Sequence, residues 1–130
     1  MDFIDIVNAE LERRRSINPR FSLRAFARQL RTDHSALSQL LRRRRRVTSR
    51  TVEELGAALR LERAAIDAAC AAADDSAVLG VLSDARFRAD CRWVASRLGI
   101  RVDRVNMSLT RLLSSGRLVM ASRKEWRANG

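Results

Sequence analysis

The chain has 130 residues, of which 46% are hydrophobic and only 5% aromatic, with no tyrosine. This length fits one ordinary domain or two small ones, and the many alanine, leucine and valine residues favour a helical, aliphatic core. The formal net charge is +11 at pH 7. Such a charge predicts binding to polyanions and argues against binding to other basic surfaces.

The basic excess is spread over both halves of the chain. Residues 1–73 hold 15 basic and 9 acidic side chains, and residues 74–130 hold 11 and 6, so neither half has the composition of an acidic effector domain. No apolar run approaches the ~18 residues that span a bilayer, and the acidic start at Met1-Asp2 is not that of a signal peptide. We therefore expect a cytoplasmic protein, associated with the bacterial nucleoid, that has no membrane partner.

The residues that carry most enzyme chemistry are scarce. Cys70 and Cys91 have no histidine or cysteine at metal-ligand spacing, which argues against zinc and predicts two small, buried thiols. The single histidine has no nucleophile and orienting acid beside it, and there is no glycine-rich phosphate loop. The sequence predicts neither a metal, nor a cofactor, nor an enzyme.

The first half predicts five short helices. Apolar residues recur at helical spacing from Phe3 to Leu11, and Asn18-Pro19 ends this first helix. Polar residues that can cap helices precede the next segments. The expected helices are 23–30 after Ser22, 34–42 after Thr32 or Asp33, 50–59 after Thr48 or Ser49, and 61 to about 73.

The second half predicts a smaller unit. Asp74-Asp75-Ser76 interrupts an alanine-rich stretch and is the expected domain boundary. Beyond it we expect a short apolar helix over 77–82, a helix over 91–98 capped by Asp90 and ended by Gly99, and a helix from Asp103 to Ser115. Strands at 118–121 and 125–127, with a turn at 122–124, predict a β-hairpin.

The predicted fold class is therefore mainly α-helical. A five-helix, repressor-type helix-turn-helix bundle over 1–73 is followed by a small winged-helix-like unit over 77–130, whose C-terminal hairpin is the wing. The two helices over 23–30 and 34–42, joined by a tight turn at Arg31-Thr32, form the helix-turn-helix of the first unit.

The helix over 34–42 has the side chains that a major-groove reading helix needs. Leu37, Leu40 and Leu41 point inward, and short or polar residues point outward. Gln39 can pair with adenine, while Ser35 and Ser38 can reach phosphate; alternatively, these serines cap the helix and Gln39 is merely solvated. The outward set is His34, Ser35, Ala36, Ser38, Gln39 and Arg42.

A run of five arginines follows this helix directly: Arg42, Arg43, Arg44, Arg45 and Arg46. Neighbouring guanidinium groups repel one another unless an anion screens them. We expect the run to contact phosphate rather than to be an ordinary solvated face. If ~6 to 8 phosphates are neutralised, the logarithm of the affinity falls against log salt with a slope of roughly −5 to −7.

The helix from Asp103 offers a second candidate surface. Val105, Leu109, Leu112 and Leu113 are expected to be buried, and a second set of residues can then contact DNA. On the hairpin, Trp126 is expected to anchor the strands. The DNA-contacting candidates of this half are Arg101, Arg104, Asn106, Ser108 and Arg111 on the helix, and Arg123 and Lys124 on the hairpin. Met107 and Trp93 instead suggest a protein contact.

The segment from Phe21-Ser22-Leu23-Arg24-Ala25-Phe26-Ala27 through Val47-Thr48 to Leu59 resembles the phage-repressor (XRE-type) helix-turn-helix superfamily. The whole chain also resembles bacterial regulators that join such a domain to a C-terminal winged-helix domain of unknown function. The matching positions there are Asn18 to Ser22, Asp90, Trp93, Val94, Ala95, Leu98, Gly99, Val105, Leu109, Leu112 and Gly116. The resemblance implies that outward residues near the start of 34–42 read bases.

Three departures from that family are evident. Arg31 stands at the turn position usually held by glycine, so it must adopt a left-handed or altered conformation at about 1 kcal/mol. Arg42-Arg43 replaces the Asn-Gly that usually follows the reading helix. The linker between the two units is also shorter than in the family.

Together these features predict a sequence-specific regulator that binds double-stranded DNA as a homodimer, because one short helix reads only a few base pairs. A monomer with both units on one duplex is the alternative mode. Two other functions compete: a protein-interaction module, antitoxin-like or a phage-type inhibitor, and a non-specific nucleic-acid-binding protein.

Overall fold

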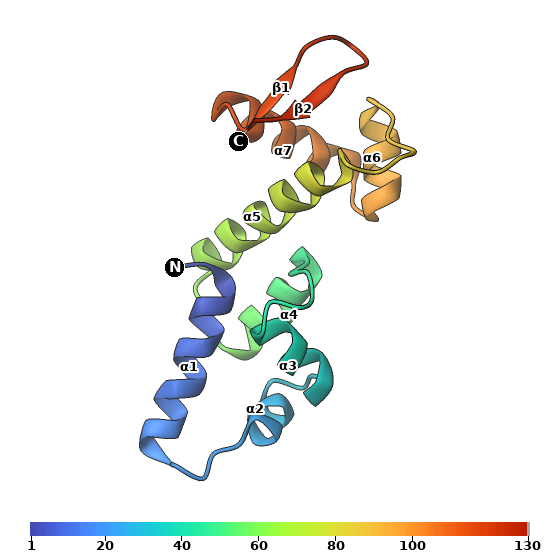
Figure 1. The fold of residues 1–130 in the computed structure, drawn as a ribbon. Coiled ribbons are helices and arrows are strands. Elements are labelled where there is room, and N and C mark those ends of the chain that lie inside the picture. The colour runs from blue at the N-terminus through green and yellow to red at the C-terminus, as the bar shows by residue number, and fades with distance from the viewer. Residues whose placement is uncertain (130) are drawn as a thin grey trace. The chain divides into compact units, whose positions relative to one another are not determined.

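The computed structural model describes residues 1–129, and this part of the chain is mainly helical, with one small antiparallel sheet (Figure 1). No helix in it is both long enough and apolar enough to cross a membrane. In chain order the elements are α1 (Phe3–Ile17), α2 (Leu23–Gln29), α3 (His34–Leu41), α4 (Ser49–Ala58), α5 (Arg63–Val81), α6 (Cys91–Leu98), α7 (Val102–Ser114), β1 (Leu118–Met120) and β2 (Trp126–Ala128).

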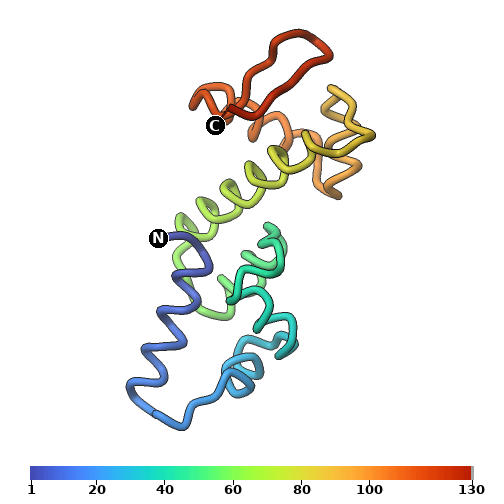
Figure 2. The backbone as a smooth tube through the Cα atoms, viewed as in Figure 1, coloured from blue at the N-terminus to red at the C-terminus, as the bar shows by residue number. Residues whose placement is uncertain are grey.

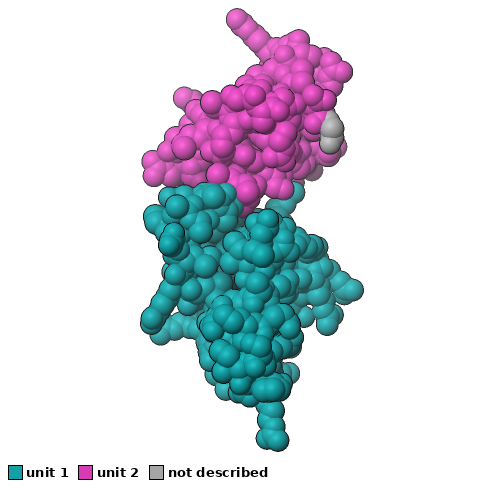
Figure 3. Space-filling view, turned by 90° about the vertical axis from the view of Figure 1, so that its left-hand side faces the viewer, with its two compact units in different colours: residues 1–70 teal, residues 71–130 magenta. Residues whose placement is uncertain are grey.

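The chain divides into two compact units, which Figure 3 shows in different colours. Unit 1 comprises Met1–Cys70, and unit 2 begins at Ala71. The division falls inside α5, which continues without a break from Arg63 to Val81 (Figure 2).

The expected loop at 74–76 and the separate helix over 77–82 are therefore wrong, because both segments belong to α5. Asp74 and Asp75 suggested a helix boundary because aspartate favours caps and loops. Both side chains are instead buried and paired with arginines of α7. With the carboxylates so engaged, the high helix propensity of the surrounding alanines decides the conformation.

Unit 1 packs α1 to α4 and the start of α5 around one apolar core. Helix starts are set by side-chain caps: Asp2 forms a capping box with Asp5, and Ser22, Asp33 and Thr48 accept from the first turns of α2, α3 and α4. The buried core consists of Phe3, Val7, Leu11, Phe26, Ala27, Leu30, Leu37, Leu40, Val52, Leu55 and Ile66.

The start of α5 approaches α4 closely at Gly56. A Cβ atom on Gly56 would lie 2.8 Å from Cγ1 of Ile66, which is shorter than a normal carbon–carbon contact. Ile66 is itself buried, so it has little room to move. A residue without a side chain is what allows this contact.

Unit 2 packs the end of α5 with α6, α7 and the hairpin around a second core. Asp90 caps α6 and Gly99 ends it in a left-handed conformation, as expected. The helix expected from Asp103 begins at Val102, and Leu113, expected to be buried, is 40% exposed. The core consists of Val78, Val81, Val94, Ala95, Val105, Leu109, Leu112 and Leu118.

The predicted hairpin forms from β1 and β2, which pair antiparallel with Val119 opposite Arg127. Trp126 is half-buried and packs at 5.7 Å, centroid to centroid, on the ring of Phe87. The expectation that Trp126 anchors the hairpin is therefore confirmed.

Candidate nucleic-acid interface

Three consecutive residues, Arg31 to Asp33, form the turn between α2 and α3 (Figure 1). Arg31, after the end of α2, has a φ of 56°, so of the two expected possibilities, a left-handed or an altered conformation, it adopts the left-handed one. The Thr32 N–H then donates to the carbonyl of Ala27 at 3.0 Å, which closes the end of α2. The Asp33 carboxylate accepts from the Ala36 N–H at 3.0 Å and starts α3.

One face of α3 is held by the core and another is left open. Leu37 and Leu40 are buried, which fixes the helix on unit 1. Ser35, Gln39 and the following Arg42 are exposed. Residues four and then three positions apart lie on one side of a helix, so these three side chains share a continuous exposed face.

The other members of the predicted reading set are less accessible. His34, Ala36 and Ser38 are half-buried rather than fully exposed. The predicted helix also ends one residue early, because Arg42 is its C-cap. The open face of α3 is therefore narrower than expected and is centred on Gln39.

The arginine run begins with a tight helix ending. Arg43 has a φ of 59°, and the Arg44 N–H donates to the carbonyl of Gln39 at 2.9 Å. This pattern is a Schellman motif, in which the left-handed position is usually glycine. It turns the chain away from the axis of α3, and all five arginines of the run remain exposed.

Arg43 differs from the rest of the run because it has internal anionic partners. Its guanidinium donates to Asp2 at 2.6 Å and to Asp5 at 2.9 Å, both at the start of α1. The hydrogen bond from Arg43 lowers the pKa of Asp2 to about 2. Arg43 thus ties the run to α1, a role that the sequence-based expectation of phosphate contact did not include.

The other four arginines of the run face solvent. No ion pair within residues 1–129 involves Arg42, Arg44, Arg45 or Arg46. Four exposed guanidinium groups next to the open face of α3 form a strongly positive surface, and arginine binds phosphate oxygens well because its donors form a planar fork.

The excess of exposed arginine extends further along the chain than the run. We name residues 20–46 the cationic segment: it contains nine arginines and a single acid, Asp33, which caps α3. The rest of unit 1 contains six arginines and eight acids. The members outside the run, which sequence reasoning missed, are Arg20, Arg24, Arg28 and Arg31, all exposed. The absence of acids over this stretch is the signal that would have identified them.

In unit 2 three predicted DNA contacts on α7 have partners within the unit, and the burial of Ser108 corrects one of them. Ser108 is fully buried and donates to Asp75 at 2.5 Å. Arg111 pairs with Asp75 at 2.9 Å, and Arg104 pairs with Asp74 at 2.6 Å. The reason is the unbroken helix α5, which places both carboxylates beside α7.

The remaining candidates of unit 2 stay accessible. Arg101 and Asn106 are exposed, although Arg101 lies 3.4 Å from the carboxylate of Asp103. Arg123 and Lys124 are exposed in the connection between β1 and β2.

The two residues that suggested a protein contact, Trp93 and Met107, differ in exposure. Trp93 is half-buried and packs edge-on against Phe87, with ring centroids 5.8 Å apart. Met107 is 58% exposed. Trp93 therefore belongs largely to the packing of unit 2, and of these two residues Met107 is the one with a free apolar surface.

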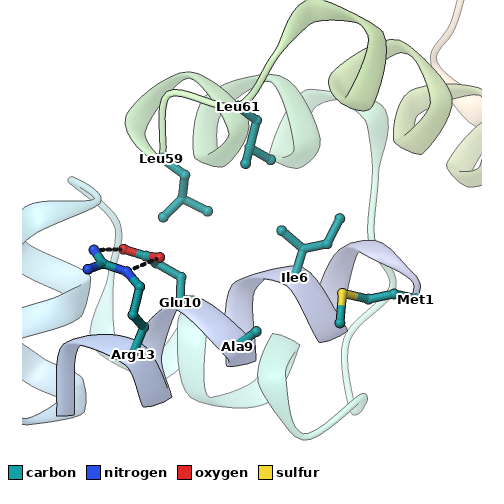
Figure 4. Close-up of a pocket in the computed structure, with 7 residues that line it drawn as sticks. All are labelled: Met1, Ile6, Ala9, Glu10, Arg13, Leu59 and Leu61. Atoms are coloured by element: carbon teal, nitrogen blue, oxygen red, sulfur yellow. Dashed lines mark hydrogen bonds and ion pairs between the residues drawn. The ribbon is translucent and has the colours of Figure 1, made fainter. Parts of the chain in front are cut away.

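Unit 1 also has a shallow hollow of about 230 Å³, and Figure 4 shows its lining. Ile6 of α1 and Leu59 and Leu61, between α4 and α5, supply apolar walls, and Glu10 and Arg13 pair at 2.7 Å at one end. None of its lining residues belongs to the cationic segment.

The cysteines are both free thiols and half-buried. Burial raises the pKa of the Cys91 thiol. Among residues 1–129 no three histidine, cysteine or acidic side chains are grouped so that they can hold a metal ion.

Comparisons with family models, with curated proteins and with solved structures find no match for this chain.

Proposed function

We propose that this protein is a sequence-specific regulator of transcription that binds double-stranded DNA and reads the major groove with α3. The observation that carries the proposal is one juxtaposition in unit 1. The open face of α3, formed by Ser35, Gln39 and Arg42, lies within a cationic segment whose single acid is used as a helix cap. Short polar side chains on a helix flanked by unpaired arginines suit a groove lined with phosphates.

In this proposal, unit 1 is a repressor-type helix-turn-helix domain of the XRE type. Helices α2 and α3 form the motif, and the left-handed Arg31 makes the turn between them. Unit 2 is a winged-helix-like unit, with the β1–β2 hairpin as its wing.

Different residues provide sequence specificity and affinity. The carboxamide of Gln39 is exposed near the middle of the open face and is suited to bidentate pairing with adenine. Arg42, Arg44, Arg45 and Arg46 supply phosphate contacts, which set register and orientation but carry no base information. Arg123 and Lys124 at the tip of the wing add further phosphate contacts.

The bound form is a homodimer. The open face of α3 spans about two helical turns, which is enough for only a few base pairs. Two copies related by a two-fold axis would read half-sites roughly 34 Å apart.

Selection of bound sequences from a random duplex pool tests this proposal. The wild type is expected to yield a palindromic consensus. Gln39→Ala should lose preference at one base position in each half-site, because one reading side chain is removed. Arg45→Ala should keep the consensus but weaken binding of all sequences and reduce the salt slope by about 1.

Arg13→Ala is the matched control for Arg45→Ala. It removes the same charge from unit 1, but Arg13 lies outside the cationic segment and pairs with Glu10. It is expected to leave both the consensus and the slope close to the wild-type values. A consensus that is unchanged in Gln39→Ala would mean that α3 is not the reading helix.

A further inference from the structure

We propose that unit 2 carries a second phosphate-binding surface, formed by Arg86, Arg88 and Arg92, whose ligand is the sugar-phosphate backbone of duplex DNA. We name these three residues the Arg86 cluster. The inference rests on the proposed function, because it takes DNA as the partner, but it concerns residues that play no part in reading by α3.

The first argument is the use of the acids in unit 2. All six of its carboxylates are engaged within the unit. Five pair with arginines, as Asp74–Arg104, Asp75–Arg111, Asp84–Arg97, Asp103–Arg101 and Glu125–Arg127, and the sixth, Asp90, caps α6.

The Arg86 cluster has no such partner. Its three side chains are exposed, and no ion pair within residues 1–129 involves any of them. Three guanidinium groups therefore lie within seven consecutive residues without an ion pair, although the charge of Arg86 also acts on the nearby Asp84 carboxylate and helps to lower its pKa. An anionic partner from outside the chain would relieve their mutual repulsion.

The second argument is that the cluster is displayed on a well-held loop. Asp84 accepts from the Arg86 N–H at 2.8 Å and from Arg97 Nε at 2.8 Å. The ring of Phe87 packs on Trp93 and on Trp126 at centroid distances of 5.8 and 5.7 Å. Arg86 and Arg88 thus flank an anchored side chain, and less backbone freedom is lost when they bind a ligand.

The third residue of the cluster, Arg92, lies on α6 and not on the loop. Arg92 is in the first turn of this helix, and its N–H donates to the capping carboxylate of Asp90 at 2.9 Å. The Asp90 carboxylate binds the backbone N–H of Arg92 and not its side chain, and the side chain of Arg92 is exposed. Loop and helix thus each supply exposed guanidinium groups, and the planar donor fork of arginine is well suited to bidentate binding of phosphate oxygens.

The chemistry favours a duplex backbone over single-stranded nucleic acid. Binding of single strands needs exposed aromatic rings on which bases stack. The aromatic residues next to the cluster are Phe87 and Trp93, and both are half-buried against each other. Charge without a stacking platform suits phosphates, which recur every ~3.4 Å of helix axis on each strand of a duplex.

The test compares two triple variants of the full chain that remove the same charge. Arg86→Gln/Arg88→Gln/Arg92→Gln removes the cluster. Arg13→Gln/Arg63→Gln/Arg127→Gln removes three exposed arginines that already pair with nearby carboxylates. Affinity for the selected duplex, for a random duplex and for single-stranded RNA is measured between about 50 and about 200 mM salt. Circular dichroism checks that both variants fold.

The cluster variant is expected to reduce the salt slope by about 2 to 3 and to weaken binding at low salt about tenfold or more, while the base preference is kept. The control should change the slope by less than about 1. Equal slopes for the two variants would overturn the inference. So would a cluster variant that loses affinity for RNA but not for duplex DNA.

Tryptophan fluorescence gives an independent readout. Both tryptophans of the chain lie in unit 2 and pack on Phe87, so a change in emission on adding duplex reports on this unit. We expect the full change in the wild type and in the control, and a smaller change in the cluster variant, in which only the wing contacts of Arg123 and Lys124 remain in this unit. A change of equal size in the cluster variant would contradict the inference.

Failure of this inference is distinguishable from failure of the proposed function. A wild type without base preference would refute the regulator, yet a loss of slope in the cluster variant on random duplex would still support the second surface. Retained base preference with an unchanged slope would refute the second surface alone.

Discussion

Ser108 shows at the scale of one residue how unit 2 uses its polar groups. Its hydroxyl is fully buried and donates to Asp75, which also accepts from Arg111. A buried carboxylate needs all its hydrogen bonds, because the loss of one leaves an oxygen that water cannot reach.

Ser108→Ala should therefore reduce the free energy of unfolding by about 1 to 3 kcal/mol, measured by urea denaturation. Base preference in duplex selection should not change. Ser114→Ala is the control, because Ser114 is exposed at the end of the same helix. Altered base preference with unchanged stability would instead show that Ser108 faces DNA.

Single residues also mark the limit of what the sequence predicts. A left-handed or altered conformation of Arg31 was predicted because the residue occupies a turn position usually held by glycine, and the left-handed one is found. Arg43 and Arg60 adopt the same conformation, with φ of 59° and 57°. Arginine has no preference for positive φ, so these two could not be predicted from residue type. The pairing of Arg43 with Asp2 was equally hidden, since the two lie far apart in the chain.

At the scale of elements, α1 is tied to the motif that follows it through Glu10. Arg13 and Arg14 both donate to the Glu10 carboxylate, at 2.7 and 2.8 Å. Arg14 in turn contacts Gln29 of α2 and lies 5.2 Å from the ring centroid of Phe26. The hydrogen bond from Arg13, followed by that from Arg14, lowers the pKa of Glu10 to about 2.

This shift predicts a pH-dependent contribution to stability. A folded-state pKa below the ordinary value of 4.5 means that the stabilisation is complete above about pH 4.5 and is lost as the pH falls toward 2. Glu10→Gln should cost about 1 kcal/mol at pH 7, after allowance for solvent screening. The difference between wild type and variant, measured by urea denaturation, should shrink as the pH falls below about 4.5.

Glu12→Gln is the matched control on the same helix, because Glu12 is 70% exposed in its pair with Arg15. Its effect should be about 0.5 kcal/mol or less. A Glu10→Gln deficit that stays constant down to pH 2 would contradict this account of the carboxylate.

Most elements could be predicted from local signals, and those that could not depended on distant partners. Capping residues such as Ser22 and Asp90 located the starts of helices, and the change of period at Leu118 located the hairpin. The break expected at Asp74 failed because its carboxylate pairs with Arg104, thirty residues later in the chain. The prediction for α3 included its exposed residues Ser35, Gln39 and Arg42, because they follow from helical spacing alone. The polar residues of α7 were assigned to solvent because their partners Asp74 and Asp75 are distant in the sequence.

At the scale of the whole molecule, the excess charge is organised rather than uniform. In unit 1 the excess positive charge lies in the cationic segment, which contains nine arginines and one acid. In unit 2 the acids are engaged internally, and no ion pair within residues 1–129 involves the Arg86 cluster. A net charge of +11 thus resolves into defined surfaces that suit a polyanion.

The ratio of affinities of the full chain for its selected duplex and for a random duplex of equal length tests the central claim most directly. Measured at physiological salt, a ratio of ~10³ or more is expected, with two chains bound per selected duplex. A ratio below about ten would contradict reading by α3 and would leave only a non-specific affinity for phosphate.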